Sequence, residues 1–315
     1  MRQFPKSAHA RLLSTYCPVL LIVIAYTTPG RCADGVTAKD GKQRKNPRYS
    51  FQADHDPNGI GKFYLGREIA HVMGYGPGGS GARWLERTSR EREEKLSLMV
   101  KSLKLRPGDV IADIGAGSGV ISVLMAEQVG PQGMILAVDV QQKMLDRLAA
   151  RCKKLGVTNV KPIKGTVKSP KLKPNSIDLA LFVDVYHEFK FPYEMMLEIS
   201  KALKPGGRAV FVEYRMEDET VPIKLVHKMT QAQVRKEIGQ LEFALKWKKT
   251  IGVLPWQHII IFERLRGKGN SDQSTGLGST TDRHVTDITA ATALLLVRLS
   301  GNCRLGRPRQ RRRTR

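Results

Sequence analysis

Three glycines and two aspartates between positions 113 and 139 have the types and spacing of a ligand-binding loop. Asp113 precedes Gly115, Gly117 and Gly119, and Asp139 follows the last glycine by 20 residues. Glycines let a loop turn tightly and let a ligand approach the backbone, where a side chain would fill the space. An acid in the position of Asp139 can accept hydrogen bonds from both hydroxyl groups of a ribose. The pattern favours a nucleoside-binding loop over the alternative, a glycine turn and a surface aspartate without a function.

The spacing of these glycines excludes two common phosphate-binding loops. A dinucleotide fingerprint has the pattern G-x-G-x-x-G/A, but this chain has Val120 where the last residue of that pattern would stand. A phosphate loop needs a Gly-Lys pair followed by Ser or Thr, and no lysine occurs between Lys104 and Lys143. The carboxylate of Asp113 also disfavours a bound pyrophosphate and suits a ligand that carries an ammonium or sulfonium group.

A second group of reactive side chains follows the apolar stretch at residues 177–183. It contains Asp184, Tyr186, His187 and Glu188. Imidazole titrates near neutral pH, so His187 is the candidate general base, with Tyr186 positioning an acceptor and Glu188 orienting the imidazole. The alternative is that His187 caps the next helix or packs beside a cofactor. Asp184, His187, Glu188 and Glu213 could together suggest a divalent metal, but no metal site is predicted, because these residues show no metal-ligand spacing motif.

Alternating strands and helices between residues 90 and 265 would position both groups. The expected strands are 110–114, 134–140, 159–164, 177–183, 209–214, 244–253 and 258–262, and the first helix is expected at 91–104. This order predicts an α/β fold with a doubly wound, seven-stranded, mostly parallel sheet, helices on both faces and an antiparallel last strand. Pro162 cannot donate a ladder hydrogen bond, which places its strand at a sheet edge. Ligands of such sheets bind beyond the carboxyl ends of the strands, where the glycine loop lies.

Residues 107–263 resemble a class I S-adenosylmethionine-dependent methyltransferase. The resemblance rests on VIADIGAGSG (110–119), AVDV (137–140), SIDLALFVDVYHEF (176–189) and LKPGGRAVFVEY (203–214). It implies the strand order 3-2-1-4-5-7-6 and S-adenosylmethionine as the cofactor. It also implies methyl transfer by in-line displacement. The motifs are much less specific for the substrate, and we expect a small-molecule or lipid-like acceptor that the lid segment selects. An RNA or protein methyltransferase, a nicotinamide or nucleotide-sugar oxidoreductase and a non-catalytic nucleoside-binding module are the alternatives, and Val120 disfavours the oxidoreductase.

The resemblance also implies which residues hold the cofactor. The glycines would line its methionine portion, Asp139 would hold the ribose, and Val140 would pack on the adenine. Thr166 would lie near the adenine edge, where the family often has an acid, and Asp184 would close the site. The full set of residues is Asp113, Gly115, Ala116, Gly117, Gly119, Asp139, Val140, Thr166 and Asp184. His227 and Trp256 are further candidates to face the pocket, with a core or surface role as the alternative.

The composition describes one basic globular protein. Among 315 residues, 53 are Lys or Arg and 29 are Asp or Glu, a formal charge of +24. This charge permits contact with nucleic acid or an anionic membrane surface, but no aromatic-basic stacking motif is present, so a solvated basic surface is the alternative. One domain fits this length, and the apolar strands exclude disorder throughout. Four scattered cysteines cannot form a disulfide scaffold.

The chain is expected to have four parts. Residues 1–33 are predicted to be a signal peptide or membrane anchor, because basic residues precede the apolar stretch 17–26. The protein would then be exported or membrane-anchored, whereas a misassigned start codon would leave a cytoplasmic enzyme. Residues 34–88 form a linker and lid, in which Tyr64 and Arg67 either contact a ligand or pack in the fold. Residues 89–265 form the methyltransferase domain, and residues 266–315, with seven arginines after position 303, form a disordered basic tail.

Overall fold

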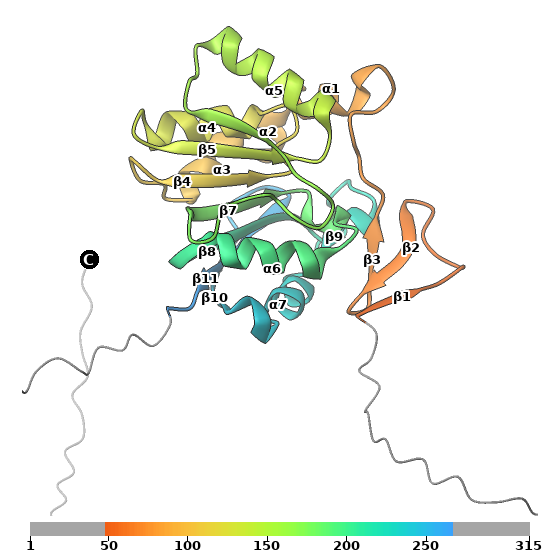
Figure 1. Cartoon of the computed structure of the whole chain (residues 1–315). Coiled ribbons are helices and arrows are strands. Elements are labelled where there is room, and N and C mark those ends of the chain that lie inside the picture. The colour runs from red at the N-terminus through yellow and green to blue at the C-terminus, as the bar shows by residue number, and fades with distance from the viewer. Residues whose placement is uncertain (1–47, 267–315) are drawn as a thin grey trace, which may run out of the picture.

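A computed structural model describes residues 48–266 (Figure 1). The predicted signal peptide or anchor at 1–33 lies outside the described residues, and so does the predicted basic tail apart from Arg266. Within residues 48–266, no helix has the length and apolar character needed to cross a membrane.

The main sheet has the predicted strand order. Its path is β10-β11-β8-β7-β4-β5-β6. The strands along this path are β10 (Leu245–Ile251), β11 (Gln257–Arg264), β8 (Leu203–Arg215), β7 (Ile177–Val183), β4 (Val110–Ile114), β5 (Met134–Asp139) and β6 (Val160–Lys164). The five strands from β8 to β6 are parallel, and β11 is antiparallel to both of its neighbours. The strand that contains Pro162 lies at the edge, as predicted, and the short β9 (Lys228–Met229) adds an unpredicted eighth strand beside β8.

Helices cover both faces of this sheet, which confirms the doubly wound architecture (Figure 1). One face carries α3 (Leu96–Ser102), α4 (Val120–Val129) and α5 (Gln142–Leu155). The other carries α6 (Pro192–Ala202) and α7 (Gln231–Ile238). The central strand β7 is apolar on both faces because its alternate side chains enter the two separate cores. The helix expected at 91–104 is divided into α2 (Arg90–Glu94) and α3, because Lys95 adopts a left-handed conformation with φ 55°.

An N-terminal three-stranded antiparallel sheet, which the residue pattern did not predict, packs beside the main domain (Figure 1). It consists of β1 (Tyr49–Phe51), β2 (Gly59–Tyr64) and β3 (Arg67–Ala70), and the short α1 (Ser80–Leu85) follows it. Arg67 attaches this sheet to the domain. Its buried guanidinium donates two hydrogen bonds to Glu237 of α7, at 2.7 and 2.9 Å, and one to the backbone oxygen of His187, at 3.0 Å. Arg67 is therefore a packing residue and not a ligand contact.

Candidate functional site

A cavity of about 580 Å³ opens at the carboxyl ends of β4, β5 and β7, where the sequence places the ligand site. This volume is within the usual range of small-molecule pockets. Gly115, Gly117, Asp139, Thr166 and Asp184 all line it, although they come from four separate segments of the chain. The fold therefore brings most of the predicted nucleoside-binding residues to one place.

The glycine loop has a geometry that only glycine satisfies. Gly115 and Gly117 have φ values of 74° and 55°, in the left-handed region that disfavours side chains. A Cβ atom at Gly115 would lie 2.5 Å from Cγ2 of Val185, and one at Gly117 would lie 2.6 Å from Cδ1 of Leu85. A side chain at either position would therefore collide with Val185 or Leu85.

Asp139 connects this loop to the end of β5. Its Oδ2 accepts a hydrogen bond from the Gly117 amide at 2.9 Å, and its Oδ1 accepts one from the Gln141 amide at 2.8 Å. Burial raises the pKa of its carboxyl group, although both amide hydrogen bonds oppose that shift. Each oxygen keeps a second lone pair, so the carboxylate can also accept hydrogen bonds from a pair of ribose hydroxyls.

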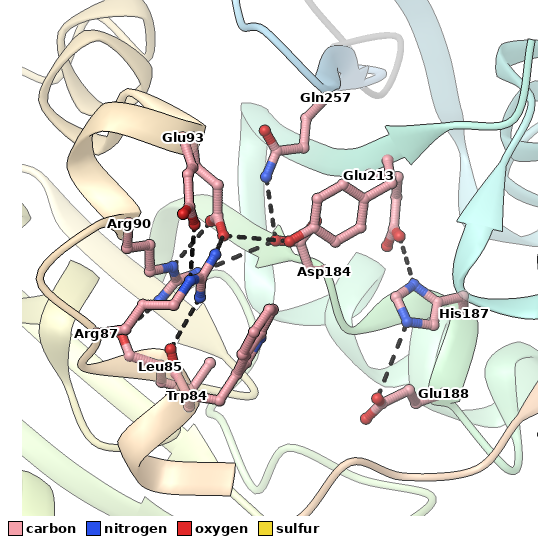
Figure 2. A network of polar contacts seen from close by, with 12 residues as sticks. Trp84, Leu85, Arg87, Arg90, Glu93, Asp184, His187, Glu188, Glu213 and Gln257 are labelled. Atoms are coloured by element: carbon pink, nitrogen blue, oxygen red, sulfur yellow. Dashed lines mark hydrogen bonds and ion pairs between the residues drawn. The ribbon is translucent and has the colours of Figure 1, made fainter. Parts of the chain in front are cut away.

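Asp184 lines the cavity and has one buried carboxylate oxygen without a hydrogen-bond partner among residues 48–266. Its Oδ2 accepts a hydrogen bond from Nε2 of Gln257 at 3.2 Å and lies 4.0 Å from the Arg90 guanidinium (Figure 2). Its buried Oδ1 accepts no hydrogen bond from any residue in the range 48–266. Burial raises the pKa of Asp184 well above its ordinary value, and the neighbouring Glu94 adds to this effect.

Three residues predicted to bind the cofactor do not line the cavity. Asp113 is buried, and its carboxylate accepts a hydrogen bond from the Ser122 hydroxyl of α4 at 2.5 Å. Gly119, at the start of α4, packs against Leu148 of α5. Ala116 packs against a small apolar cluster. These residues support the loop from behind. Val140 and Thr166 do line the cavity, as predicted.

His187 also lines the cavity. It lies in a 3-10 turn, η2 (Tyr186–Glu188), that follows β7. The predicted orienting contact of Glu188 is instead made by Glu213 of β8, whose Oε2 lies 2.6 Å from Nδ1 of His187. The other ring nitrogen, Nε2, lies 3.1 Å from Nδ1 of His227 and 3.9 Å from Oε1 of Glu188. Figure 2 shows the ring between the two glutamates.

Burial dominates the electrostatics around His187. It lowers the pKa of His187 to about 4 and raises the pKa values of Glu188 to about 7 and of Glu213 to about 8. It also lowers the pKa of His227 to about 4. These directions all favour neutral side chains, because a low-dielectric site stabilises charges poorly.

Tyr186 does not reach the cavity, so the predicted role in positioning an acceptor is wrong. Its ring is fully buried and packs edge-on against Phe182 and Phe211, with centroid distances of 6.3 and 5.1 Å. The η2 turn directs Tyr186 into the core and His187 toward the cavity. Neighbouring residues of one tight turn thus have different environments.

The residue pattern did not single out Arg90, and it named Glu213 only as a member of a possible metal group, not as the partner of His187. The signal for Glu213 was present, since an acid that ends a buried apolar strand is unusual without a polar partner. His227 was considered as a residue facing the pocket, with a core or surface role as the alternative, and it does line the cavity.

The exposed part of the cavity lining combines four apolar side chains with the polar His71, Lys190 and Lys224. The apolar members are Val72, Met73, Trp84 and Val167, which remain between 41% and 54% exposed. Exposed apolar side chains gathered at a pocket mark a binding surface for apolar groups.

Comparison with known proteins agrees with this geometry. A family model described as a methyltransferase domain matches residues 105–261. The protein-L-isoaspartate O-methyltransferase of Methanococcus aeolicus is 27% identical over 151 residues, which is 47% of this chain and 64% of that protein. The demethylmenaquinone methyltransferase of Listeria welshimeri is 25% identical over 122 residues, which is 39% of this chain and 50% of that protein.

A solved structure described as a SAM-dependent methyltransferase from Aquifex aeolicus shares the fold. It matches with a TM-score of 0.55 and 20% identity, over 59% of this chain and 98% of that chain. The chain spans between 33% and 64% of the length of the first curated relatives that it matches. Given the glycine loop, Asp139 and the strand order, residues 105–261 belong to the class I S-adenosylmethionine-dependent methyltransferases, for which S-adenosylmethionine is the expected cofactor.

Proposed function

We propose that the protein transfers a methyl group from S-adenosylmethionine to an oxygen or nitrogen atom of a small, largely apolar or lipid-like molecule. One observation carries the proposal. A single cavity joins the nucleoside-binding loop to a polar wall formed by His187, Glu188 and His227. The cofactor and the acceptor can therefore meet in one enclosed space.

The chain's own residues account for cofactor binding. Asp139 would accept hydrogen bonds from the ribose hydroxyls, and Gly115 and Gly117, which line the same cavity, would let the methionine portion approach the backbone. The Asp184 carboxyl group lines the same cavity and would be the acceptor for the ammonium group. This arrangement fixes the sulfonium in the cavity, and the positively charged sulfur is a good leaving group.

The reaction needs alignment and the loss of one proton. A lone pair of the acceptor forms a bond with the methyl carbon, the bond from that carbon to sulfur breaks, and sulfur leaves as a neutral thioether. An oxygen or nitrogen acceptor also releases a proton. Holding both reactants in line supplies much of the rate enhancement in such displacements.

The exposed apolar side chains of the cavity lining support the choice of acceptor. Val72, Met73, Trp84 and Val167 would pack against an apolar body, while the acceptor atom points inward to the polar wall. Transfer of apolar surface from water onto these side chains would contribute about 25 cal/mol per Å².

The test combines cofactor binding with methyl transfer. The full chain should bind S-adenosylmethionine in calorimetry, and Asp139→Ala should weaken binding by about 2–3 kcal/mol, because a charged, doubly hydrogen-bonded acceptor is lost. Asp146→Ala, on the exposed side of α5, is the matched control. Labelled methyl groups should pass from the cofactor to an organic-solvent extract of cells. Unchanged affinity in Asp139→Ala refutes the cofactor assignment, and label found only in RNA or protein refutes the acceptor class.

A further inference from the structure

We propose that His187, Glu188 and His227 bind a divalent transition-metal ion at the acceptor end of the cavity. Two imidazoles and one carboxylate are a ligand set that suits zinc, iron and related ions. The site is independent of the cofactor residues, but its role in methyl transfer rests on the function proposed above.

The distances among the three ligand atoms fit one ion. Nε2 of His187 lies 3.1 Å from Nδ1 of His227, and Oε1 of Glu188 lies 3.9 and 3.7 Å from these two atoms. The point equidistant from the three atoms lies about 2.1 Å from each, and zinc in proteins lies about 2.0–2.2 Å from nitrogen and carboxylate oxygen. An ion near that point would have three protein ligands without a large rearrangement.

Buried hydrogen bonds hold two of the ligands in place. Glu213 contacts Nδ1 of His187 at 2.6 Å, which leaves Nε2 as the nitrogen that faces the other ligands. The other oxygen of Glu213 accepts a hydrogen bond from the Tyr186 amide at 3.0 Å. Oε1 of Glu188 accepts one from the Met73 amide, also at 3.0 Å. A carboxylate on the second nitrogen of a histidine is the usual support for a metal-ligating imidazole.

The cavity supplies the open coordination position. His187, Glu188 and His227 all line it, so a fourth ligand can approach from the acceptor side. A hydroxyl bound to the ion would lose its proton to solvent more readily, and its oxygen would then attack the methyl carbon. In this arrangement His187 is a metal ligand and not a general base, which revises the interpretation drawn from the residue pattern.

A direct hydrogen bond between the two imidazoles is the competing explanation for their 3.1 Å separation. It would account for the histidine pair, but it gives no role to the third group, Glu188, which lies near both ring nitrogens. The two explanations differ in whether the protein binds metal.

The experiment measures metal binding without cofactor or acceptor. Full-length protein without a polyhistidine tag is stripped with a chelator and titrated with Zn²⁺, and with Co²⁺ to follow visible absorption of the bound ion. We expect about one ion per chain, with a spectrum typical of low coordination number. His227→Ala and Glu188→Gln should each weaken binding by at least tenfold, as should the supporting change Glu213→Gln. His55→Ala, outside the cluster, should bind as the wild type does.

The outcomes separate this proposal from the proposed function. Absence of stoichiometric binding, or unchanged binding in both His227→Ala and Glu188→Gln, overturns the metal site, even if S-adenosylmethionine binds normally. Metal binding that depends on these residues supports the site, even if no methylated product forms. Thermal melts of both variants show whether they are folded, and the two substitutions serve as independent checks.

Discussion

Glu213 Oε2 lies 2.6 Å from His187 Nδ1, and neither side chain has more than 2% of its surface exposed. The contact joins the end of β8 to the turn after β7 and points the other ring nitrogen of His187 toward the cavity. Removal of the carboxylate should therefore change how His187 acts without touching the cofactor site.

We expect Glu213→Gln to lower the rate of methyl transfer by about 10–100-fold, the usual loss when the supporting carboxylate of a functional histidine is removed. The affinity for S-adenosylmethionine, measured by calorimetry, should stay within twofold of wild type. Glu198→Gln, on the exposed face of α6, is the control. A parallel loss of cofactor affinity and rate would show that Glu213 supports the whole fold and not His187.

Gly117→Ala should abolish tight cofactor binding. The new methyl group would lie 2.6 Å from Leu85 and stand in a left-handed backbone conformation, which costs about 1–2 kcal/mol for a residue other than glycine. Gly156→Ala has a similar φ of 67° but nothing within 4 Å, so it separates backbone strain from steric blockage. Calorimetry on both variants should show weaker cofactor binding only for Gly117→Ala. Equal affinities would mean that the ligand does not approach this loop.

Removal of one partner of the buried ion pair between Arg67 and Glu237 should strongly destabilise the fold. Both side chains are buried, so Glu237→Ala would leave a guanidinium without its counterion at a cost of about 3–5 kcal/mol. The double variant Arg67→Met with Glu237→Leu should recover most of this loss, because it removes both charges. Denaturant unfolding measures the free energy in each case. A double variant as unstable as Glu237→Ala would show that the pair does more than balance charge.

His258 should make the protein less stable in acid. Burial lowers the pKa of its imidazole from 6.5 to about 4. As the pH falls from about 6.5 to about 4, His258 becomes protonated in the unfolded chain but stays neutral in the folded chain. The free energy of unfolding therefore falls by up to about 1.4 kcal/mol per pH unit from this residue. The full contribution is present above about pH 6.5 and is lost by about pH 4.

Unfolding of the wild type and of His258→Leu, measured at several pH values between 7 and 4, checks this expectation. The variant should lose less stability over the interval, because leucine does not titrate. Parallel curves for the two proteins would contradict a buried, neutral His258.

The residue pattern predicted the central sheet well because its information is local. Apolar strand segments, helix-ending glycines and helical periodicity recur along 110–264. The local residue pattern of each segment therefore predicts whether it is a strand or a helix. The N-terminal sheet was missed because its signals are weak. The β2–β3 hairpin turns at Leu65 and Gly66, both with positive φ, and leucine is an uncommon residue for such a turn.

The sequence by itself determined the glycine loop and the acid at 139, since short motifs in a parallel sheet place their residues at one edge. Through the family resemblance it also determined the strand order. Only the tertiary structure decided which side chains meet. His187 lies 26 residues from Glu213 and 40 from His227 in the sequence. Nothing in the local pattern indicates that these three side chains lie in contact. It also decided that Tyr186 enters the core while its neighbour His187 faces the cavity. Packing sets the direction of each side chain in a tight turn, and packing depends on the whole fold.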